Sequence, residues 1–371
     1  MSEEAFADRA SGTAPSRGGS ASPAPAGHSA ATSRPPTLRE VAEAARVDPS
    51  TVSRALRPAT QRMVRPDTLA RVLATAEMLG YRANPFARGL KNQRSMTIGM
   101  LLPDLANPLF PPIVRGIEDG LRGDGYVLIL ANTDRDQARE RSLVDALMTR
   151  RVDGMILATA ERTYPLLDEL VAVHMPVVLV NRAAEAPAVP TVSSNVHQGI
   201  GLAVKHLVEL GHRRIAHVGG ARSISTGFLR HQHFHAWMQS LGLSVDNDLV
   251  VFADWFTKDL GARACEELLD RTTDFTAIVA ANDLIALGCY TALRRRGLSV
   301  PQDVSVIGYN GSGWCDDVNP PLTSVHVPKY ELGLRAAALL LEAVEARQTV
   351  PATVLLPTTL DIRQSTAPPR M

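Results

Sequence analysis

The chain has 371 residues, enough for two or three domains, with 45% hydrophobic residues and a formal net charge of +1. It contains no apolar run of membrane length, and its three cysteines, Cys265, Cys289 and Cys315, are well separated and unlike a metal-binding pair. These features argue against a membrane-spanning or disulfide-rich protein and favour a reducing cytoplasm.

The N-terminal residues 1–36 contain 9 Ala, 7 Ser, 5 Pro and 4 Gly, so we expect a disordered tail that buries no core. This segment lacks the apolar stretch of a secretory signal. Residues 37–94 carry 11 Arg or Lys against 5 Asp or Glu, a balance of +6, whereas residues 95–371 sum to −5. A basic headpiece on a mildly acidic body is typical of a DNA-binding module joined to another domain.

Two short amphipathic helices joined by a tight turn are predicted over residues 37–56, TLREVAEAARVDPSTVSRAL. Val47 is the apolar residue of the turn, and Asp48 can cap the second helix. Pro49 stands at the first helical position, where its missing N–H costs nothing. The pattern predicts a helix-turn-helix whose second helix enters the major groove of DNA, with a helical hairpin packed in a core as the alternative.

A third helix is predicted over residues 66–81, ending at Gly80, and NPFARGLKNQ follows it. From Thr97 onward, apolar strands alternate with helices in two series, separated by a break around residues 183–190. Strands that are apolar throughout predict parallel sheets covered on both faces. We therefore expect two α/β lobes, with ligands bound beyond the carboxyl ends of the strands.

Several segments together resemble the LacI (lactose repressor)/GalR family of bacterial transcriptional regulators, from about Thr37 to about Arg363. They are VSRAL, the hinge LGYRANPFARGL, TIGMLLPDLANPLF, RRVDGMIL, ELGHRRIAHVGG, ANDLIALG, DVSVIGYN and PPLTSVH. The resemblance implies an α/β protein with an N-terminal all-α helix-turn-helix headpiece and a bilobal periplasmic-binding-protein-like domain of two parallel-sheet lobes. The expected boundaries are a tail at 1–36, the headpiece at 37–83, a hinge at 84–94, the effector-binding and dimerisation domain at 95–364, and a disordered tail at 365–371.

The resemblance also implies which residues contact DNA. Arg54 is the strongest candidate for reading a base, because a guanidinium can contact guanine O6 and N7 together. Ser50 and Pro49 match neighbouring base-facing positions, whereas Thr51 and Ser53 suit phosphate contacts. The full expected set is Thr37, Pro49, Ser50, Thr51, Ser53, Arg54, Asn84, Ala87, Arg88 and Leu90.

In the family, the hinge folds when two copies pair in the minor groove of DNA, and Leu90 matches the leucine that wedges into the central base step. The alternative is a plain interdomain linker with an incidental leucine. The headpiece departs from the family pattern in three ways. Arg46 replaces a turn glycine at a position expected to need positive φ; RPATQRM lengthens a loop and adds Arg57 and Arg62; and Arg65 replaces an N-cap serine, leaving Asp67 nearby.

Effector residues follow from the same resemblance. The expected set is Asn107, Phe110, Asn132, Asp134, Asn181, Arg230, Trp255, Asn282, Asp283 and Asn310. This mixture suits a polyhydroxylated ligand such as a sugar, although a purine stacked on Phe110 and Trp255 is an alternative. Asn310 and Ser194 stand where acidic groups are common in the family. Each of these residues also has a purely structural interpretation, Asp283 above all, because aspartate is a good helix cap.

The sequence therefore predicts a ligand-controlled repressor that binds a pseudo-palindromic operator in double-stranded DNA as a homodimer, in the cytoplasm and associated with the nucleoid. We expect no cofactor, no membrane contact and no metal, because His231 and His235 share a helix face without a cysteine or paired carboxylate to complete a site. An enzyme is disfavoured because no nucleophile–base pair or phosphate loop is recognisable. A sugar- or nucleoside-binding protein without specific DNA recognition is the alternative.

Overall fold

The computed structural model describes residues 36–56, 58–81, 94–185, 189–348 and 350–370. The chain divides into two compact units, Met1–Ala83 and Asn84–Met371, and each is described by itself. In the described ranges, no helix is both long and apolar enough to cross a lipid bilayer.

The first unit is all-α in its described part. Its helices are α1 (Leu38–Ala45), α2 (Pro49–Ala55), α3 (Pro58–Gln61) and α4 (Pro66–Met78). Val41, Val52 and Val72, one from each longer helix, are fully buried against one another in a small core. A hydrogen bond also joins α4 to the end of α1, because the Nε–H of Arg71 donates to the carbonyl oxygen of Ala45 at 3.0 Å. The predicted helix-turn-helix is thus braced by a third helix.

Local signals explain where these helices begin and end. Thr37 caps α1: its hydroxyl accepts from the N–H of Glu40 at 3.4 Å, and its own N–H donates to the Glu40 carboxylate at 2.6 Å. Arg46 ends α1 at φ 53°, which confirms that this turn needs a positive φ although glycine is absent. Arg65 precedes α4 without any side-chain capping bond.

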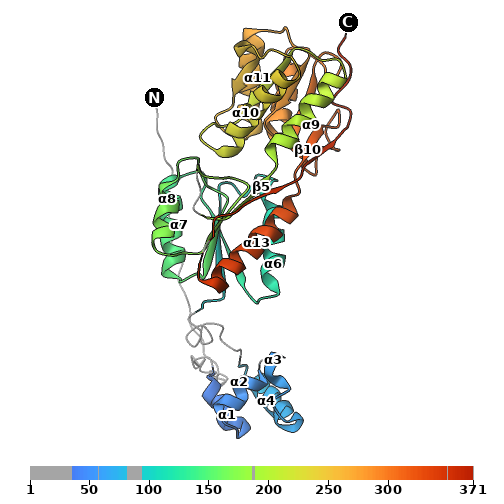
Figure 1. The fold of residues 1–371 in the computed structure, drawn as a ribbon. Coiled ribbons are helices and arrows are strands. Elements are labelled where there is room, and N and C mark those ends of the chain that lie inside the picture. The colour runs from blue at the N-terminus through green and yellow to red at the C-terminus, as the bar shows by residue number, and fades with distance from the viewer. Residues whose placement is uncertain (1–35, 57, 82–93, 186–188, 349, 371) are drawn as a thin grey trace, which may run out of the picture. The chain divides into compact units, whose positions relative to one another are not determined.

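The second unit contains two six-stranded sheets, one in each lobe (Figure 1). The first sheet has the order β11-β5-β4-β3-β1-β2 and the second the order β12-β10-β9-β8-β6-β7. The strands of the first sheet are β1 (Thr97–Leu102), β2 (Val127–Asn132), β3 (Gly154–Leu157), β4 (Val177–Val180), β5 (Thr191–Ser194) and β11 (Thr353–Leu356). Those of the second are β6 (Ile215–Gly219), β7 (Val250–Phe252), β8 (Ala277–Ala280), β9 (Ser305–Asn310), β10 (Thr323–His326) and β12 (Thr359–Asp361).

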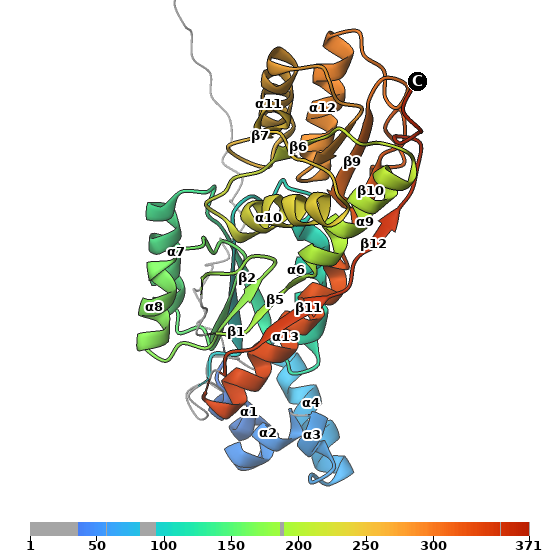
Figure 2. The ribbon, with the colours of Figure 1, turned by 45° about the horizontal axis from the view of Figure 1, so that its top comes forward.

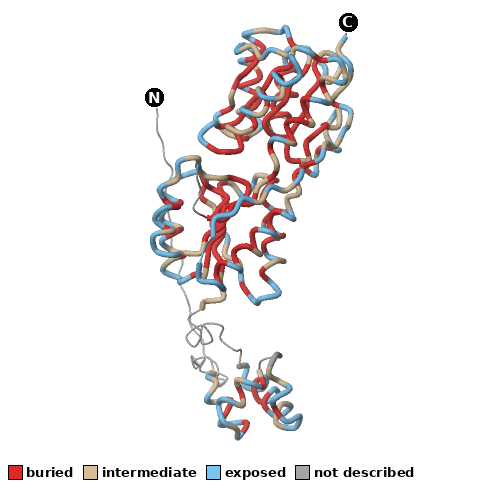
Figure 3. Tube along the Cα trace, in the orientation of Figure 1, coloured by how far each residue is buried: buried red, intermediate tan, exposed pale blue. Residues whose placement is uncertain are grey.

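The pairing is parallel throughout except at one edge, where β12 runs antiparallel to β10. The sheets are therefore those predicted, with one antiparallel edge strand added. β1 and β3 are almost continuously buried, because helices cover both faces of the sheet. Figure 3 shows this burial along the central strands of both lobes, with exposed residues on the outer sides of the helices.

Helices cover both faces of each sheet. In the first lobe, α6 (Phe110–Arg122) and α13 (Lys329–Ala346) pack on one face, and α7 (Gln137–Thr149) and α8 (Pro165–Ala172) on the other (Figure 1). In the second lobe, α9 (Val196–Glu209) and α10 (Ser225–Ser240) lie opposite α11 (Lys258–Arg271) and α12 (Asp283–Arg295). A short 3-10 helix, Asn247–Leu249, precedes β7.

The chain passes between the lobes three times (Figure 2). It leaves the first lobe between β5 and α9, returns between β10 and α13, and leaves again between β11 and β12. The return brings α13 into the first lobe, where it packs along α6. A methyl group on Gly333 would lie 2.1 Å from the carbonyl oxygen of Ile113, so the helices approach closely there.

The prediction of a disordered tail at residues 365–371 was wrong for residues 365–370. Ser365 is fully buried, and its hydroxyl donates to the carbonyl oxygen of Val306 at 2.6 Å and accepts from the N–H of Thr323 at 2.8 Å. Ala367 continues this anchoring by donating its N–H to the Ser305 hydroxyl at 3.1 Å. The segment is held by polar groups of β9 and β10, which composition alone does not reveal. The predicted tail at 1–36 lies, except for Pro36, outside the described residues, as does Met371.

Candidate functional site

The recognition helix α2 turns one face to the core and another to solvent. Val52 and Ala55 are fully buried, whereas Ser50 and Arg54 are exposed. Ser50 and Arg54 are four residues apart, so their side chains lie on the same helix face. Pro49 is also exposed, and Thr51 and Ser53 are half-buried.

The start of α2 is fixed by a side-chain cap. The Asp48 carboxylate accepts from the N–H of Ser50 at 2.7 Å, as the sequence predicts for this position. Hydrogen bonds from Ser50 lower the pKa of Asp48, with a smaller contribution from the charge of Arg54. The cap keeps the first turn of α2 formed, which is where a recognition helix presents side chains to base edges.

The remaining predicted DNA contacts lie outside α2. Thr37 is exposed at the N-terminus of α1, where it forms the capping box with Glu40. The hinge contacts Asn84, Ala87, Arg88 and Leu90 lie outside the described residues.

In the second unit, a small cavity of about 20 Å³ lies at the carboxyl ends of the strands. It is lined by Asn107, Leu109, Phe110, Asn181, Arg182, Thr226, Arg230, Phe256, Asn282 and Asn310. Six of the ten predicted effector residues are in this set: Asn107, Phe110, Asn181, Arg230, Asn282 and Asn310. The volume holds about one water molecule, so a sugar-sized ligand enters only if the walls move apart.

Strand ends and helix starts bring these side chains together. Asn181 directly follows β4 and Asn310 ends β9, and both have positive φ, 66° and 114°. Asn282 caps α12, because its side-chain oxygen accepts from the N–H of Ile285 at 2.8 Å. Phe110 begins α6. All of these positions lie at the edge where parallel α/β sheets bind ligands.

Two arginines of the cavity are almost completely buried. Arg182 is 5% exposed and Arg230 is 3% exposed. Burial lowers the pKa of Arg182 to about 10 and also lowers that of Arg230, since removal from water disfavours the charged form. Both side chains lie in a cavity whose described lining contains no carboxylate.

Four predicted effector residues do not line the cavity. Asn132 uses its side-chain oxygen to accept from the N–H of Leu105 at 2.9 Å and donates its amide N–H to Asp134, so these two residues of the β2 end bond locally. Trp255 lies beside the cavity, and the guanidinium groups of Arg135 and Arg182 lie 5.3 and 5.1 Å from its ring centroid.

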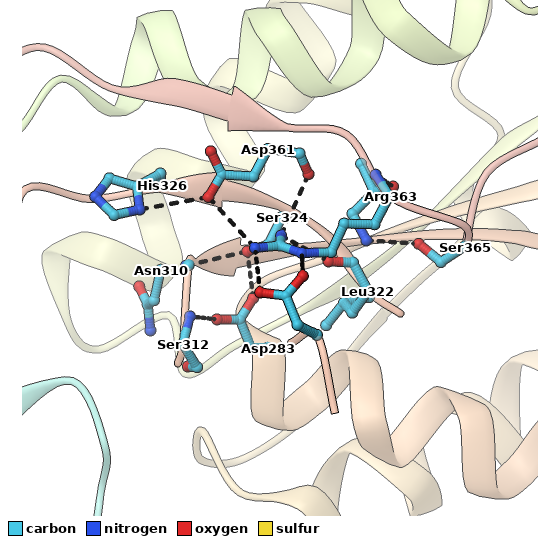
Figure 4. Close-up of polar contacts among 12 residues, drawn as sticks. Asp283, Asn310, Ser312, Leu322, Ser324, His326, Asp361, Arg363 and Ser365 are labelled. Carbon is cyan, nitrogen blue, oxygen red and sulfur yellow. Dashed lines mark hydrogen bonds and ion pairs between the residues drawn. The ribbon is translucent and has the colours of Figure 1, made fainter. Parts of the chain in front are cut away.

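Asp283, the fourth, serves a structural purpose within the second lobe (Figure 4). Its carboxylate accepts from the N–H of Ser312 at 2.7 Å and from the hydroxyl of Ser324 at 2.5 Å. It therefore ties the start of α12 to β10 and to the loop after β9. Burial nevertheless raises the pKa of Asp283. The neighbouring Asn282, not Asp283, caps α12.

Sequence reasoning left four lining residues out of the predicted set: Leu109, Arg182, Thr226 and Phe256. Arg182 and Phe256 each directly follow a predicted effector residue, Asn181 and Trp255 respectively. The prediction therefore identified both loops but not these two side chains. Thr226 lies in the first turn of α10, and no sequence signal marks it.

Histidines cluster elsewhere in the second lobe without forming a metal site. Nδ1 of His197 lies 3.4 Å from Nδ1 of His233. The rings of His231 and His235 pack edge to face, with their centroids 4.5 Å apart. No group of three or more potential metal ligands is present among the described residues.

The two units together define a class of protein. A helix-turn-helix with an exposed, capped second helix precedes a two-lobed body whose cavity gathers polar side chains at the strand ends. This combination defines a DNA-binding regulator that responds to a small molecule.

Comparison with known proteins identifies the family. The sequence model described as "Bacterial regulatory proteins, lacI family" matches residues 37–84, and that of a "Periplasmic binding protein-like domain" matches residues 204–366. Catabolite control protein A of Priestia megaterium is 34% identical over 331 residues, which cover 89% of this chain and 99% of that protein.

Solved structures agree with this match. The transcriptional regulator CelR in complex with cellobiose is 33% identical, with a TM-score of 0.70, over 89% of this chain and 99% of that one. The lac repressor dimer bound to operator and an anti-inducer is 27% identical, with a TM-score of 0.78, over 90% of this chain and 100% of that one. This chain belongs to the lacI family of bacterial regulatory proteins. It is a DNA-binding transcriptional regulator with an effector-binding domain.

Proposed function

We propose that the protein is a homodimeric repressor that reads two half-sites of a pseudo-palindromic operator. The observation that carries this proposal is the exposed face of α2, where Ser50 and Arg54 stand together on a capped helix. Arg54 reads guanine in the major groove, Ser50 and Pro49 contact adjacent base edges, and Thr51, Ser53 and Thr37 bond phosphates.

The paired hinge segments complete the operator complex. Residues Asn84, Ala87, Arg88 and Leu90 contact the minor groove, and Leu90 of each copy wedges into the central base step. Segments this short form a stable helix only with a partner, because helix nucleation is unfavourable below about a dozen residues. Hinge folding therefore depends on DNA and on the spacing of the two protomers.

The effector is a polyhydroxylated small molecule of the sugar class, bound in the cavity between the lobes. Support comes from the amide and guanidinium groups that line the cavity and from the CelR relative, which was solved with cellobiose. A purine remains the second candidate, since Phe110 and Phe256 provide two aromatic walls.

Effector binding reaches the DNA through movement of the lobes. Two hydrogen bonds join the lobes: the N–H of Arg162 donates to the carbonyl oxygen of Ser223 at 3.0 Å, and that of Ala183 donates to the Ser225 hydroxyl at 2.8 Å. A ligand larger than the cavity changes these contacts and so the distance between the paired hinges. Couplings of this kind typically amount to about 1–3 kcal/mol. The mechanism needs no catalytic step and no cofactor, and it operates in the cytoplasm on the nucleoid.

Operator selection with the full chain tests the proposal. Random duplexes are bound by the protein, recovered and sequenced, and we expect a pseudo-palindrome to be enriched. Affinity for this duplex falls steeply as salt rises from about 50 to 200 mM, because phosphate contacts release counterions. Selection that yields no consensus, or binding that is independent of salt, would instead support a ligand-binding protein without specific DNA recognition.

A further inference from the structure

Hydrogen-bond donors predominate among the polar side chains that line the cavity. It consists of four asparagines, one threonine and two arginines, with no aspartate or glutamate in the described lining. A neutral sugar needs both donors and acceptors, because each hydroxyl group donates as well as accepts. The ratio of donors to acceptors in the lining therefore indicates the chemical class of the ligand.

The asparagine oxygens are largely used within the protein. That of Asn107 accepts from the N–H of Leu109 at 3.0 Å, and that of Asn282 accepts from the N–H of Ile285 at 2.8 Å. That of Asn310 accepts from Arg230 Nη2 at 3.2 Å. Since all three partners are obligate donors, the orientation of each amide is determined. Each of these asparagines keeps its NH₂ group as the polar group left for a ligand.

One guanidinium nitrogen of Arg230 has no hydrogen-bond partner in the described chain. Its Nη1 donates to the carbonyl oxygen of Ala281 and its Nη2 to Asn310, and the guanidinium lies 3.9 Å from the ring centroid of Tyr309. These contacts hold the group in one orientation. Its Nε–H is buried and has no hydrogen-bond partner among the described residues. Buried donors are nearly always satisfied in folded proteins, so this one is open to an acceptor, either the adjacent Tyr309 hydroxyl, which also lacks a hydrogen-bond partner in the described chain, or an atom of a ligand.

Three carboxylates act electrostatically on the two arginines: Asp283 on Arg230, and Glu161 and Glu140 on Arg182. Asp283 accepts from Ser312 and Ser324, Glu140 accepts from the hydroxyl of Tyr164 at 2.5 Å, and Glu161 accepts from the side-chain amide of Gln137 at 3.5 Å. None of the three lines the cavity. Arg182 donates to the carbonyl oxygen of Thr159 at 3.2 Å, and no carboxylate bonds to it in the described chain. Arg182 and Arg230 thus line the cavity, and no carboxylate in the described lining neutralises their charges.

We propose that the effector is an anionic sugar derivative, whose carboxylate or phosphate oxygens are bound by Arg230 and Arg182. The proposal rests on the proposed function of this cavity as the effector site. The oxyanion supplies the acceptor that Arg230 Nε lacks, and the asparagine NH₂ groups donate to the remaining oxygens. A planar guanidinium suits either oxyanion, so the shared chemistry is an oxygen-rich anion on a polyhydroxylated chain.

Matched probes test the class of ligand. The full chain is titrated with glucose, gluconate and glucose 6-phosphate, and with the corresponding galactose series, by calorimetry and thermal denaturation. We expect an acidic member to bind at least tenfold more tightly than its neutral parent. Gluconate or galactonate alone identifies a carboxylate, and a 6-phosphate alone identifies a phosphate. A neutral sugar that binds as tightly as its acids, or the absence of binding by every acidic probe, overturns the proposal.

A near-isosteric substitution sharpens the test. Asn310→Asp places a carboxylate beside Arg230, so affinity for the acidic probe is expected to fall at least tenfold while the fold is retained. Arg230→Gln and Arg182→Gln are expected to reduce it similarly. Arg271→Gln, which removes an exposed guanidinium paired with Glu267, is the control and leaves affinity unchanged. Equal affinity in wild type and Asn310→Asp overturns the proposal.

Duplex binding is measured in the same preparations, so that DNA binding and ligand binding are tested separately. If the wild type binds its selected operator and a neutral sugar changes that binding, the anion assignment fails and the regulator assignment stands. If an acidic probe binds but no duplex is selected, the proposed operator function fails and the ligand assignment stands.

Discussion

The guanidinium of Arg182 lies over the indole ring of Trp255, 5.1 Å from the ring centroid. Arg182 follows β4 of the first lobe, and Trp255 follows β7 of the second, so the pair joins the lobes beside the cavity. A second guanidinium, that of Arg135, lies 5.3 Å from the same ring. Trp255, expected from the sequence to be a platform for the ligand, here contacts protein cations.

Truncation of this indole is expected to destabilise the fold. Trp255→Ala lowers the free energy of unfolding by about 1–2 kcal/mol, because the cation–π contact and its apolar surface are lost. Trp255→Phe retains a ring and recovers part of this loss. Urea denaturation measures both variants, and equal stability of the two would contradict a cation–π contribution.

Arg54 is expected to carry base recognition. Arg54→Ala weakens binding to the selected operator by about 1–3 kcal/mol, because a bidentate contact with guanine is lost. Binding to unrelated duplexes changes little. Arg62→Ala, which removes an exposed arginine outside α2, is the matched control for charge. Electrophoretic shifts on both duplexes measure the effect, and an equal loss on each would mean that Arg54 contacts phosphate.

Leu90 is expected to separate specific from non-specific binding. Leu90→Ala removes the apolar wedge that the family resemblance assigns to the central base step, so operator binding is lost and non-specific binding is retained. Titration with operator and with random duplex measures the ratio. Unchanged operator affinity would favour the plain-linker interpretation of residues 84–94.

The close approach of α6 and α13 is expected to tolerate no added methyl group. A Cβ on Gly116 would lie 2.0 Å from the carbonyl oxygen of Tyr330, so Gly116→Ala forces the helices apart and costs about 1–3 kcal/mol or more. Gly123→Ala is the control, because nothing lies within 4 Å of its Cβ position. Thermal denaturation compares the two, and similar midpoints would contradict the tight packing.

His217 is expected to make the protein less stable in mild acid. Burial, the main cause, lowers the pKa of His217 to about 3, against 6.5 for the unshifted group. The folded state therefore resists protonation while the unfolded state accepts it, so this contribution is present above pH 6.5 and is lost as pH falls toward 3. Between pH 7 and 5 the free energy of unfolding drops by about 2 kcal/mol from this residue.

The slope of stability against pH is the measurement for this histidine. Wild type and His217→Leu are unfolded with urea at several pH values between 7 and 5. The variant is expected to show a shallower slope, whatever its overall stability. Parallel slopes would mean that other histidines cause the acid sensitivity.

In the headpiece, the helix starts and the turn could be predicted from neighbouring residues. The cap at Asp48 and proline at the first helical position, Pro49, are read from neighbours in the chain, and both appear in the structure. The positive φ at Arg46, which the family resemblance implies, also appears. Helix starts and turns depend on contacts within a few residues, so the sequence by itself determined them. The alternation of apolar strands and helices is also a local pattern, and its two series predicted the two α/β lobes.

The composition of the cavity was decided only by the tertiary structure. Asn132, Asp134 and Asp283 have suitable chemistry at strand or helix ends, yet local bonds hold them away from the lining. Thr226 lines it without any sequence signal, and Phe256 lines it in place of the predicted Trp255. The order of strands in each sheet and the packing of loops select which ends converge.

The C-terminus illustrates the same division. Residues 365–370 have the composition of a tail, but Ser365 satisfies polar groups of β9 and β10 that lie more than forty residues earlier in the chain. Periodicity and capping are local properties, so sequence alone determined the class of protein and its helices. Convergence of distant residues depends on the packed arrangement of both lobes, so only the tertiary structure decided which side chains meet a ligand.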